Sequence, residues 1–178
     1  MKQLLTAEFN AKITHDPAWA ATLTEPVEIL DYCNMNFSPI THLSPLLRFT
    51  GRNEDGDVAS FEQCENLKVA EGTFHGSVNF QWAAIEKIGE LIITRTNRAG
   101  YAANFDYCKS LKVASGTFPG PATFDHAGIE KIDNLNILES SASGHAASFR
   151  ECEELKIAEG TYPGYVDFYN SGVEQIAG

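Results

Sequence analysis

The sequence predicts a mainly β protein, built as a right-handed parallel-strand solenoid with a short helical cap at its N-terminal end. Three observations predict this class. A block of residues recurs every 44 positions, apolar side chains within each block are spaced by two, and no helical period separates the short apolar runs. The 178 residues are 43% hydrophobic and 11% aromatic, which suffices for the packed core of a single domain.

The recurring block contains an Ala-x-Phe sequence, a Cys, a Leu-Lys-apolar-Ala run and a Gly-Thr-aromatic turn. Its three copies occupy residues 59–76, 103–120 and 147–164. Roughly 20 of the 44 positions are identical between the first two copies, far more than chance allows. Each 44-residue repeat divides into two coils, because one apolar spacing occurs twice in it: first at Phe61, Cys64, Leu67 and Val69, then at Ile85, Ile88, Leu91 and Ile93.

Each coil is expected to contribute short strands to a parallel sheet. The alternation of Leu67 and Val69 about an outward Lys68 is typical of a strand with one buried face. The preceding apolar pair at a spacing of three predicts a tight turn or a single helical turn. Second short strands are expected at residues 78–80, 122–124 and 166–168, each following a glycine that suits a corner: Gly76, Gly120 and Gly164.

The first 35 residues lack the repeat and are predicted to form a helical cap, followed by the repeat solenoid at residues 36–178. Thr6 suits the N-cap of a short helix. Asp16 and Pro17 suit the start of a second helix, and Trp19 can shield the first coil from water. The expected apolar side of the first helix consists of Leu5, Phe9 and Ile13.

The run Ala103-Asn104-Phe105, Cys108, Leu111, with Ile85 and Ile88 in the alternate coil, resembles the leucine-rich repeats of the BspA-like type. The resemblance covers about residues 36 to 178. It implies a leucine-rich-repeat-like solenoid with binding surfaces and no common enzymatic activity. The sequence departs from that family in its uneven coils and in its Gly-Thr-Phe-Pro-Gly turns.

The cysteines and histidines predict no catalytic or metal site. Cys64, Cys108 and Cys152 share one repeat position, where like coils lie about 9.5 Å apart, too far for a disulfide and unsuited to zinc. They are expected to be small buried side chains, whereas Cys33 lies outside this column. The histidines have no metal-ligand spacing, and no nucleophile or phosphate loop is marked out. We therefore expect no enzyme, metal or cofactor.

Three columns are candidate surfaces. Lys68, Lys112 and Lys156 are expected to point outward, and with the aromatic turns they form the candidate interaction surface. Glu86, Glu130 and Glu174 make a neighbouring column, and such opposite charges are more often only a solubilising face. The turn aromatics are expected either to stack in a buried corner, which is favoured, or to form an exposed ridge. These aromatics are Phe74, Phe118 and Tyr162.

The C-terminal coil ends at an open sheet edge, which should pair with something. One expectation is an end-to-end homodimer. The other is that residues 170–178 fold over the last coil and cap it. The candidate dimer residues are Val166, Phe168, Val173 and Ile176.

Charge helps to rank the function classes. With 24 acidic and 13 basic side chains the formal charge is −11, which argues against binding a nucleic-acid backbone or an anionic membrane. The favoured function is a non-catalytic protein–protein interaction module, which is expected in the cytoplasm. The alternative is a small acidic decoy that mimics nucleic acid in an enzyme's basic groove. Its candidate acidic patch is Glu151, Glu153, Glu154 and Glu159.

Overall fold

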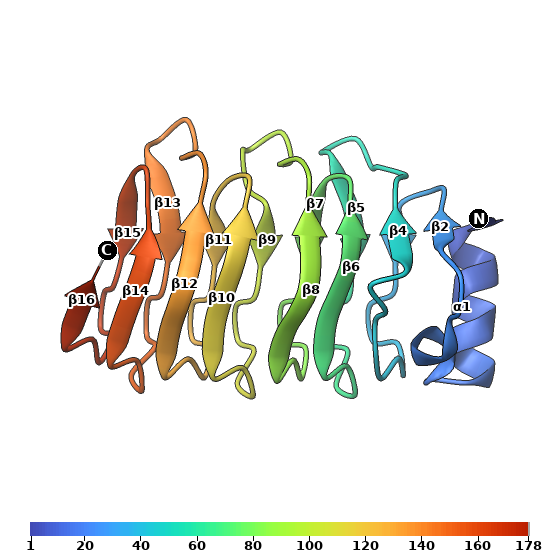
Figure 1. Cartoon of the computed structure of the whole chain (residues 1–178), viewed down its shortest axis with the longest axis horizontal. Helices are drawn as coiled ribbons and strands as arrows, with labels where there is room; N and C mark the ends of the chain where they lie inside the picture. The colour runs from blue at the N-terminus through green and yellow to red at the C-terminus, as the bar shows by residue number, and fades with distance from the viewer. Residues whose placement is uncertain (178) are drawn as a thin grey trace.

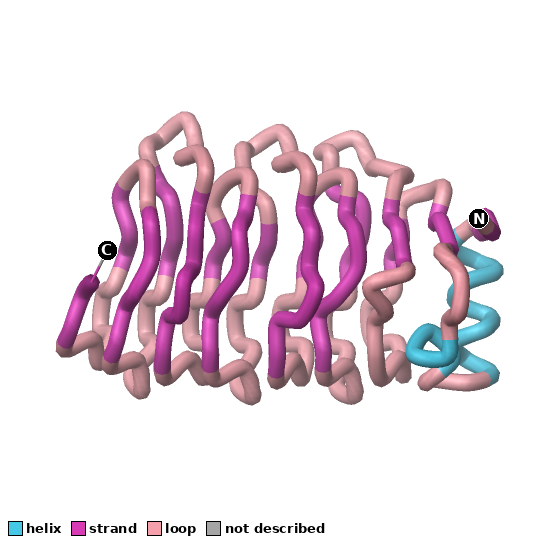
Figure 2. Tube along the Cα trace, viewed as in Figure 1, coloured by secondary structure: helices cyan, strands magenta, loops and turns pink. Residues whose placement is uncertain are grey.

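The protein is mainly β, with parallel strands in sheets and few helices. The computed structural model describes residues 1–177. The helices are α1 (Thr6–His15) and one turn of 3₁₀ helix, η1 (Trp19–Thr22), and both lie at the N-terminal end (Figure 2). The strands of the N-terminal half are β1 (Lys2–Leu4), β2 (Val27–Ile29), β3 (Cys33–Asn34), β4 (Leu47–Phe49), β5 (Asp57–Ser60), β6 (Val69–Phe74), β7 (Ser77–Asn79) and β8 (Lys87–Ile93). Those of the C-terminal half are β9 (Ala103–Asn104), β10 (Val113–Phe118), β11 (Ala122–Thr123), β12 (Lys131–Ile137), β13 (His145–Ser148), β14 (Ile157–Thr161), β15 (Tyr165–Asp167) and β16 (Gln175–Ala177).

The chain alternates between two sides of the molecule as it advances along the long axis (Figure 1). On one side lies a seven-stranded sheet in the order β15-β13-β11-β9-β7-β5-β3. The other side holds a five-stranded sheet, β1-β2-β4-β6-β8, and a four-stranded sheet, β10-β12-β14-β16. Every strand pair is parallel, and from β5 onward one strand of each side alternates with one of the other.

The two sides enclose one continuous hydrophobic core, whose centre is a stack of phenylalanine rings. Rings of adjacent coils lie parallel, with centroids 5.2 Å apart for Phe80 and Phe105 and 5.1 Å apart for Phe105 and Phe124. Because each ring comes from the same position of successive coils, the parallel register of the seven-stranded sheet builds the stack. The full stack runs through Phe61, Phe80, Phe105, Phe124, Phe149 and Phe168.

The predicted short strands and turns are present, but the Leu-x-Val interpretation was wrong in detail. Strands β7, β11 and β15 fall at residues 77–79, 122–123 and 165–167, close to the expected positions. The Phe61–Cys64–Leu67 segment forms two successive turns, with Cys64 and Leu67 amides bonded to Phe61 and Cys64 carbonyls. However, strand β10 begins at Val113, which is 40% exposed, and the buried residue is Ala114. The inward alternation therefore starts one residue later than the sequence pattern predicts.

The N-terminal segment is less uniformly helical than expected. Helix α1 begins at Thr6 and its N-cap is Leu5, so Thr6 is not the cap. The buried side of this helix is Phe9 and Ile13, whereas Leu5 is 50% exposed. Three strands, β1, β2 and β3, also lie within residues 1–35, so residue 35 does not mark a change from helix to strand.

Every second coil of the seven-stranded side carries an extra loop that rises above the strands. The three loops occupy residues 53–57, 97–101 and 141–145, and in each the first and last residues are joined by a backbone hydrogen bond. The shorter coils pass directly beneath them. A Cβ atom at Gly120 would lie 2.7 Å from the carbonyl oxygen of Gly100, so only glycine fits this corner.

Candidate functional site: a polar groove on the seven-stranded sheet

The outward side of the seven-stranded sheet carries a row of short polar side chains. In each coil this residue lies between two core residues, as Asn79 lies between Val78 and Phe80, so strand alternation turns it away from the core. Strand register aligns these residues from coil to coil. The row consists of Asn34, Ser60, Asn79, Asn104, Thr123, Ser148 and Asp167.

Asparagine and aspartate in this row satisfy the backbone of their own coil. The Oδ1 of Asn79 accepts a hydrogen bond from the Gln81 amide at 3.0 Å, and Asn104 does the same for the Asp106 amide at 2.8 Å. Such side-chain bonds to the amide two residues on are the usual Asx turn. The same bond forms at Asn34 and Asp167. These four residues therefore end their short strands by an identical device.

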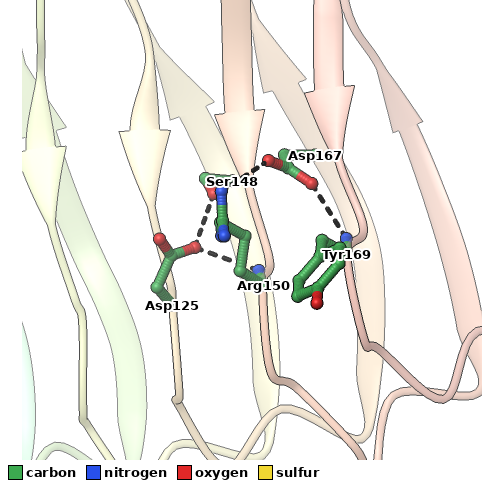
Figure 3. Close-up of polar contacts among 5 residues, drawn as sticks. All are labelled: Asp125, Ser148, Arg150, Asp167 and Tyr169. Atoms are coloured by element: carbon green, nitrogen blue, oxygen red, sulfur yellow. Dashed lines mark hydrogen bonds and ion pairs between the residues drawn. The ribbon is translucent and has the colours of Figure 1, made fainter.

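Where the row has serine or threonine, the backbone amide two residues later donates its hydrogen bond to a side chain of the preceding coil. The Asp125 amide, two residues after Thr123, donates to the Asp106 carboxylate at 2.8 Å. One coil further on, Asp125 accepts from the Arg150 amide and from the Ser148 hydroxyl (Figure 3). Adjacent coils are thus joined by side-chain bonds as well as by the strand ladder.

A groove of about 420 Å³ crosses strands β5, β7, β9 and β11 on this side. Its floor includes Asn79, Asn104 and Thr123 from the polar row. Asp57, Asn97 and Tyr101 from the raised loops line its upper edge, and Asp106 lines it lower on the sheet. Asp57 accepts hydrogen bonds from the side-chain amides of Asn97 and Asn53, at 3.1 and 3.2 Å. The groove is therefore polar, with its upper edge held by bonds between two loops.

Below the groove, a stack of three aromatic side chains follows the corner of the sheet. The rings of Trp82 and Tyr107 are parallel at 4.0 Å, and those of Tyr107 and His126 are parallel at 4.6 Å. All three residues have a positive φ, between 57° and 62°, so the same corner conformation places each ring beside the next. Trp82 is 48% exposed. Tyr107 and His126 are half-buried, and each of the three residues directly follows the position that Asp106 occupies in its own coil.

At the C-terminal end of this sheet an arginine lies on the polar side. The Arg150 guanidinium is 3.4 Å from the Asp167 carboxylate and 5.0 Å from the centre of the Tyr169 ring (Figure 3). Asp167 also accepts the Tyr169 amide. The protein's own guanidinium is thus held between a carboxylate of the polar row and an aromatic ring of the next coil.

The lysines of the predicted column directly precede strands β6, β10 and β14, and each pairs with a glutamate of the following coil. Lys68 lies 2.8 Å from Glu86, and Lys112 lies 2.8 Å from Glu130. Lys156 and Glu174 repeat the pair at 3.3 Å. All six side chains are largely exposed, so each pair contributes at most about 1 kcal/mol. The column is a repeated set of ion pairs and lies away from the groove.

The aromatic residues of the Gly-Thr-aromatic turns do not form a surface. Phe74 and Phe118 are fully buried, which agrees with the favoured corner stack and removes them from the candidate interaction surface. Tyr162 is partly buried, and its hydroxyl has no hydrogen-bond partner among residues 1–177. Burial raises the pKa of Tyr162 to about 12. The hydroxyl is the only chemical difference from the Phe74 and Phe118 side chains, and it is buried.

The predicted acidic patch is interrupted by lysines. Glu151, Glu153 and Glu154 line a hollow of about 320 Å³, but Lys109 and Lys112 line it as well. Glu159 belongs to β14, in the sheet on the other side of the molecule, and is not among the residues that line the hollow. Acidic and basic side chains therefore alternate here.

The candidate dimer residues lie in or beside the last strands of the two sides. Val166, Phe168 and Val173 are half-buried, and Ile176 is 66% exposed. Residues 175–177 form strand β16, which pairs in parallel with β14 and extends the sheet. The expectation that residues 170–178 fold over the last coil is thus wrong for residues 175–177, while Gly178 lies outside the described residues.

The four cysteines are buried and free. Cys64, Cys108 and Cys152 donate hydrogen bonds to carbonyl oxygens of preceding coils, at 3.1, 3.1 and 3.0 Å. Burial raises the pKa of Cys64 to about 11 and those of Cys108 and Cys152 to about 12, and it also raises that of Cys33. The thiols are therefore protonated and enclosed. Within the part of the chain that the structure describes, no three His, Cys, Asp or Glu residues are grouped as metal ligands.

Sequence reasoning missed the polar groove, although a signal for it was present. The residue between the small apolar residue and the large apolar one, which is Met35 in the first coil and phenylalanine in the others, is always Asn, Ser, Thr or Asp. The loops that close the upper edge could not be placed, because their approach to the sheet depends on contacts between coils.

No protein-family model, curated protein or solved structure matches the chain. Across residues 1–177, every helix is too short or too polar to cross a membrane.

Proposed function

We propose that the protein is a non-catalytic interaction module that binds another protein through the outward side of its seven-stranded sheet. The observation that carries the proposal is the groove of about 420 Å³, whose floor is built from one repeated row of short polar side chains. A regular row on stacked coils offers a long surface of constant chemistry, which is how repeat proteins bind extended partners.

The same proposal includes the fold subtype. Alternating strands on two sides, one continuous core and a 44-residue period support a right-handed, leucine-rich-repeat-like solenoid of the BspA-like type. The groove lies on the side that receives the Ala-x-Phe blocks, the part of the repeat on which the resemblance rests. The proposed binding side therefore coincides with the most regular part of the repeat.

The interaction module is better supported than an acidic decoy of nucleic acid. A decoy needs a continuous negative stripe, whereas three lysine–glutamate pairs recur on one side and lysines line the hollow at the acidic patch. We also propose a cytoplasmic location, which the four free thiols support because such thiols persist in reducing compartments. An end-to-end homodimer stays a prediction.

Site-specific photo-cross-linking tests the proposed side. A benzophenone amino acid at Gln81, whose amide bonds to Asn79 of the groove floor, is compared with the same group at Asn136 on β12 of the opposite side. After irradiation in an extract of the cells that express the protein, we expect a discrete cross-linked partner from position 81 only. Equal cross-linking from both positions, or none from position 81, would contradict the proposal.

A further inference from the structure

We propose that the groove binds an arginine side chain carried by an extended segment of the partner protein. The proposal rests on the proposed interaction function and names the chemistry that the groove selects. It commits to one ligand group, a guanidinium, which the carboxylates of Asp57 and Asp106 and the ring of Tyr101, all of which line the groove, would receive.

The first argument is charge. Asp57 and Asp106 line the groove, and within residues 1–177 no Lys or Arg lines it. Residues 1–177 contain five ion pairs, and neither Asp57 nor Asp106 takes part in any of them. Asp57 is bonded to two neutral amides, and Asp106 accepts the Asp125 amide, so their hydrogen bonds leave both negative charges uncompensated. A cation is the complement to such a surface.

The surroundings of Asp106 strengthen this argument. Burial raises the pKa of the Asp106 carboxyl, although hydrogen bonds from the Asp125 amide and the Thr123 side chain act in the opposite direction. Burial therefore makes the ionised form less favourable than it is in an exposed aspartate. A cation placed beside Asp106 would relieve that penalty, because an opposite charge stabilises the carboxylate.

The second argument is that the protein already holds one guanidinium on this side of the sheet. Arg150 lies against the Asp167 carboxylate and over the Tyr169 ring. The groove offers carboxylates and a tyrosine ring from earlier coils of the same side: Asp106 and Tyr101 flank β9, two coils before Arg150, and Asp57 lies in β5, four coils before it. Arg150 thus shows that a carboxylate and an aromatic ring on this surface can hold a guanidinium between them. The groove is lined by the same two kinds of group.

The third argument is shape. The groove crosses four adjacent strands, so its length is about 14 Å at about 4.8 Å per strand. That length admits about four residues of extended peptide, each about 3.3 Å long. A planar guanidinium can pair with a carboxylate and stack on an aromatic ring at once, whereas a lysine ammonium is a compact point charge. The combination of two carboxylates with the flat ring of Tyr101 therefore favours arginine over lysine.

The test is a titration of the full chain with three blocked pentapeptides, Gly-Ala-X-Ala-Gly, where X is arginine, lysine or citrulline. Binding is followed by the NMR signals of the Trp82 indole and of the Asn79, Asn97 and Asn104 side-chain amides. We expect the arginine peptide to shift these signals in 50 mM salt. Affinity should be at least about fivefold lower for lysine, and the uncharged citrulline peptide should cause no shift.

Two charge-matched variants locate the effect. Asp106→Asn keeps the acceptor for the Asp125 amide and removes one negative charge, so it should weaken arginine binding about tenfold. Asp133→Asn removes the same charge on the opposite side, where Asp133 faces Lys131 at 3.4 Å, and should leave binding unchanged. Equal losses in the two variants, equal binding of lysine and arginine peptides, or no shift with arginine would overturn the proposal.

Cross-linking at Gln81 separates this inference from the function on which it rests. If a partner is captured there while the arginine peptide causes no shift, the interaction function stands and the arginine assignment is wrong. If the arginine peptide binds and no partner is captured from either side, the interaction function is wrong.

Discussion

The two sides of the molecule share one core but carry different kinds of side chain on their outward surfaces. On the side of β6, β8, β10, β12, β14 and β16, long charged side chains pair across coils, as Lys112 pairs with Glu130. On the seven-stranded side, short polar side chains bond to the backbone and leave a groove above them. Side-chain length accounts for the difference, because the short residues of the polar row leave space above the sheet between Asp57, Asn97 and Tyr101 on one edge and Asp106 on the other.

Because both sides share one core, a substitution in the core should lower the stability of the whole molecule. Phe105→Ala removes the middle ring of the phenylalanine stack, which contacts rings on both neighbouring coils. We expect a loss of about 3–5 kcal/mol in the free energy of unfolding, the usual cost of a buried Phe→Ala change. Urea unfolding measures it. As a control, Leu138→Ala at a 56% exposed site should cost less than about 1 kcal/mol, and similar losses would contradict the described core.

Alkaline pH should destabilise the core through its thiols, three of which bond to carbonyl groups of preceding coils. In the unfolded chain a thiol has a pKa near 9, whereas those of Cys108 and Cys152 are about 12 when folded. Between these values the unfolded state has lost a proton that the native state retains, so stability falls as pH rises above 9. The slope is at most about 1.4 kcal/mol per pH unit for each thiol.

Unfolding measured from pH 8 to pH 10.5 should show this decline, and Cys108→Ala should make it shallower. A stability that does not depend on pH over this range would show that the thiols are not enclosed. Below pH 9 the thiols should contribute no pH dependence, because both states are protonated there.

Residues of the polar row should differ in their contribution to stability, because Asn104 accepts a backbone hydrogen bond and Thr123 does not. Asn104→Ala removes the acceptor of the Asp106 amide and should cost about 1 kcal/mol. Thr123→Ala should cost less, because the corresponding Asp125 amide is bonded to Asp106 instead. Asn104→Asp should restore stability, since Asp167 makes the same bond in the last coil. Thermal unfolding of the three variants distinguishes these outcomes, and an equal loss at positions 104 and 123 would contradict the assignment of different acceptors to the Asp106 and Asp125 amides.

The ion-pair side should show the smallest effects. A double-mutant cycle on Lys112→Ala and Glu130→Ala should give a coupling energy below about 1 kcal/mol that shrinks in high salt. A coupling of several kcal/mol would mean that this column stabilises the fold substantially and is more than an exposed charged surface.

The sequence predicted the stacked parallel strands well, because one coil must resemble the next for its Phe and Cys side chains to align. Positions such as Phe61, Cys64 and Leu67 were correctly expected to be buried. The surface was harder to predict. Lys68 was correctly expected to point outward, but its contact with Glu86 joins two coils, and the groove is lined by residues of four different coils, among them Asp57 and Asp106. Such neighbours are set by register between coils, which one sequence repeat does not specify.

The central claim, that the seven-stranded side binds the partner, is tested most directly by filling the groove. Thr123→Arg places a guanidinium on the groove floor beside Asp106, and Asn136→Arg adds the same charge on the opposite side. Both variants are compared with the unaltered protein for recovery of the partner first identified by cross-linking, after circular dichroism shows that they are folded. The account predicts that Thr123→Arg abolishes recovery and that Asn136→Arg preserves it. Undiminished recovery by Thr123→Arg would contradict it.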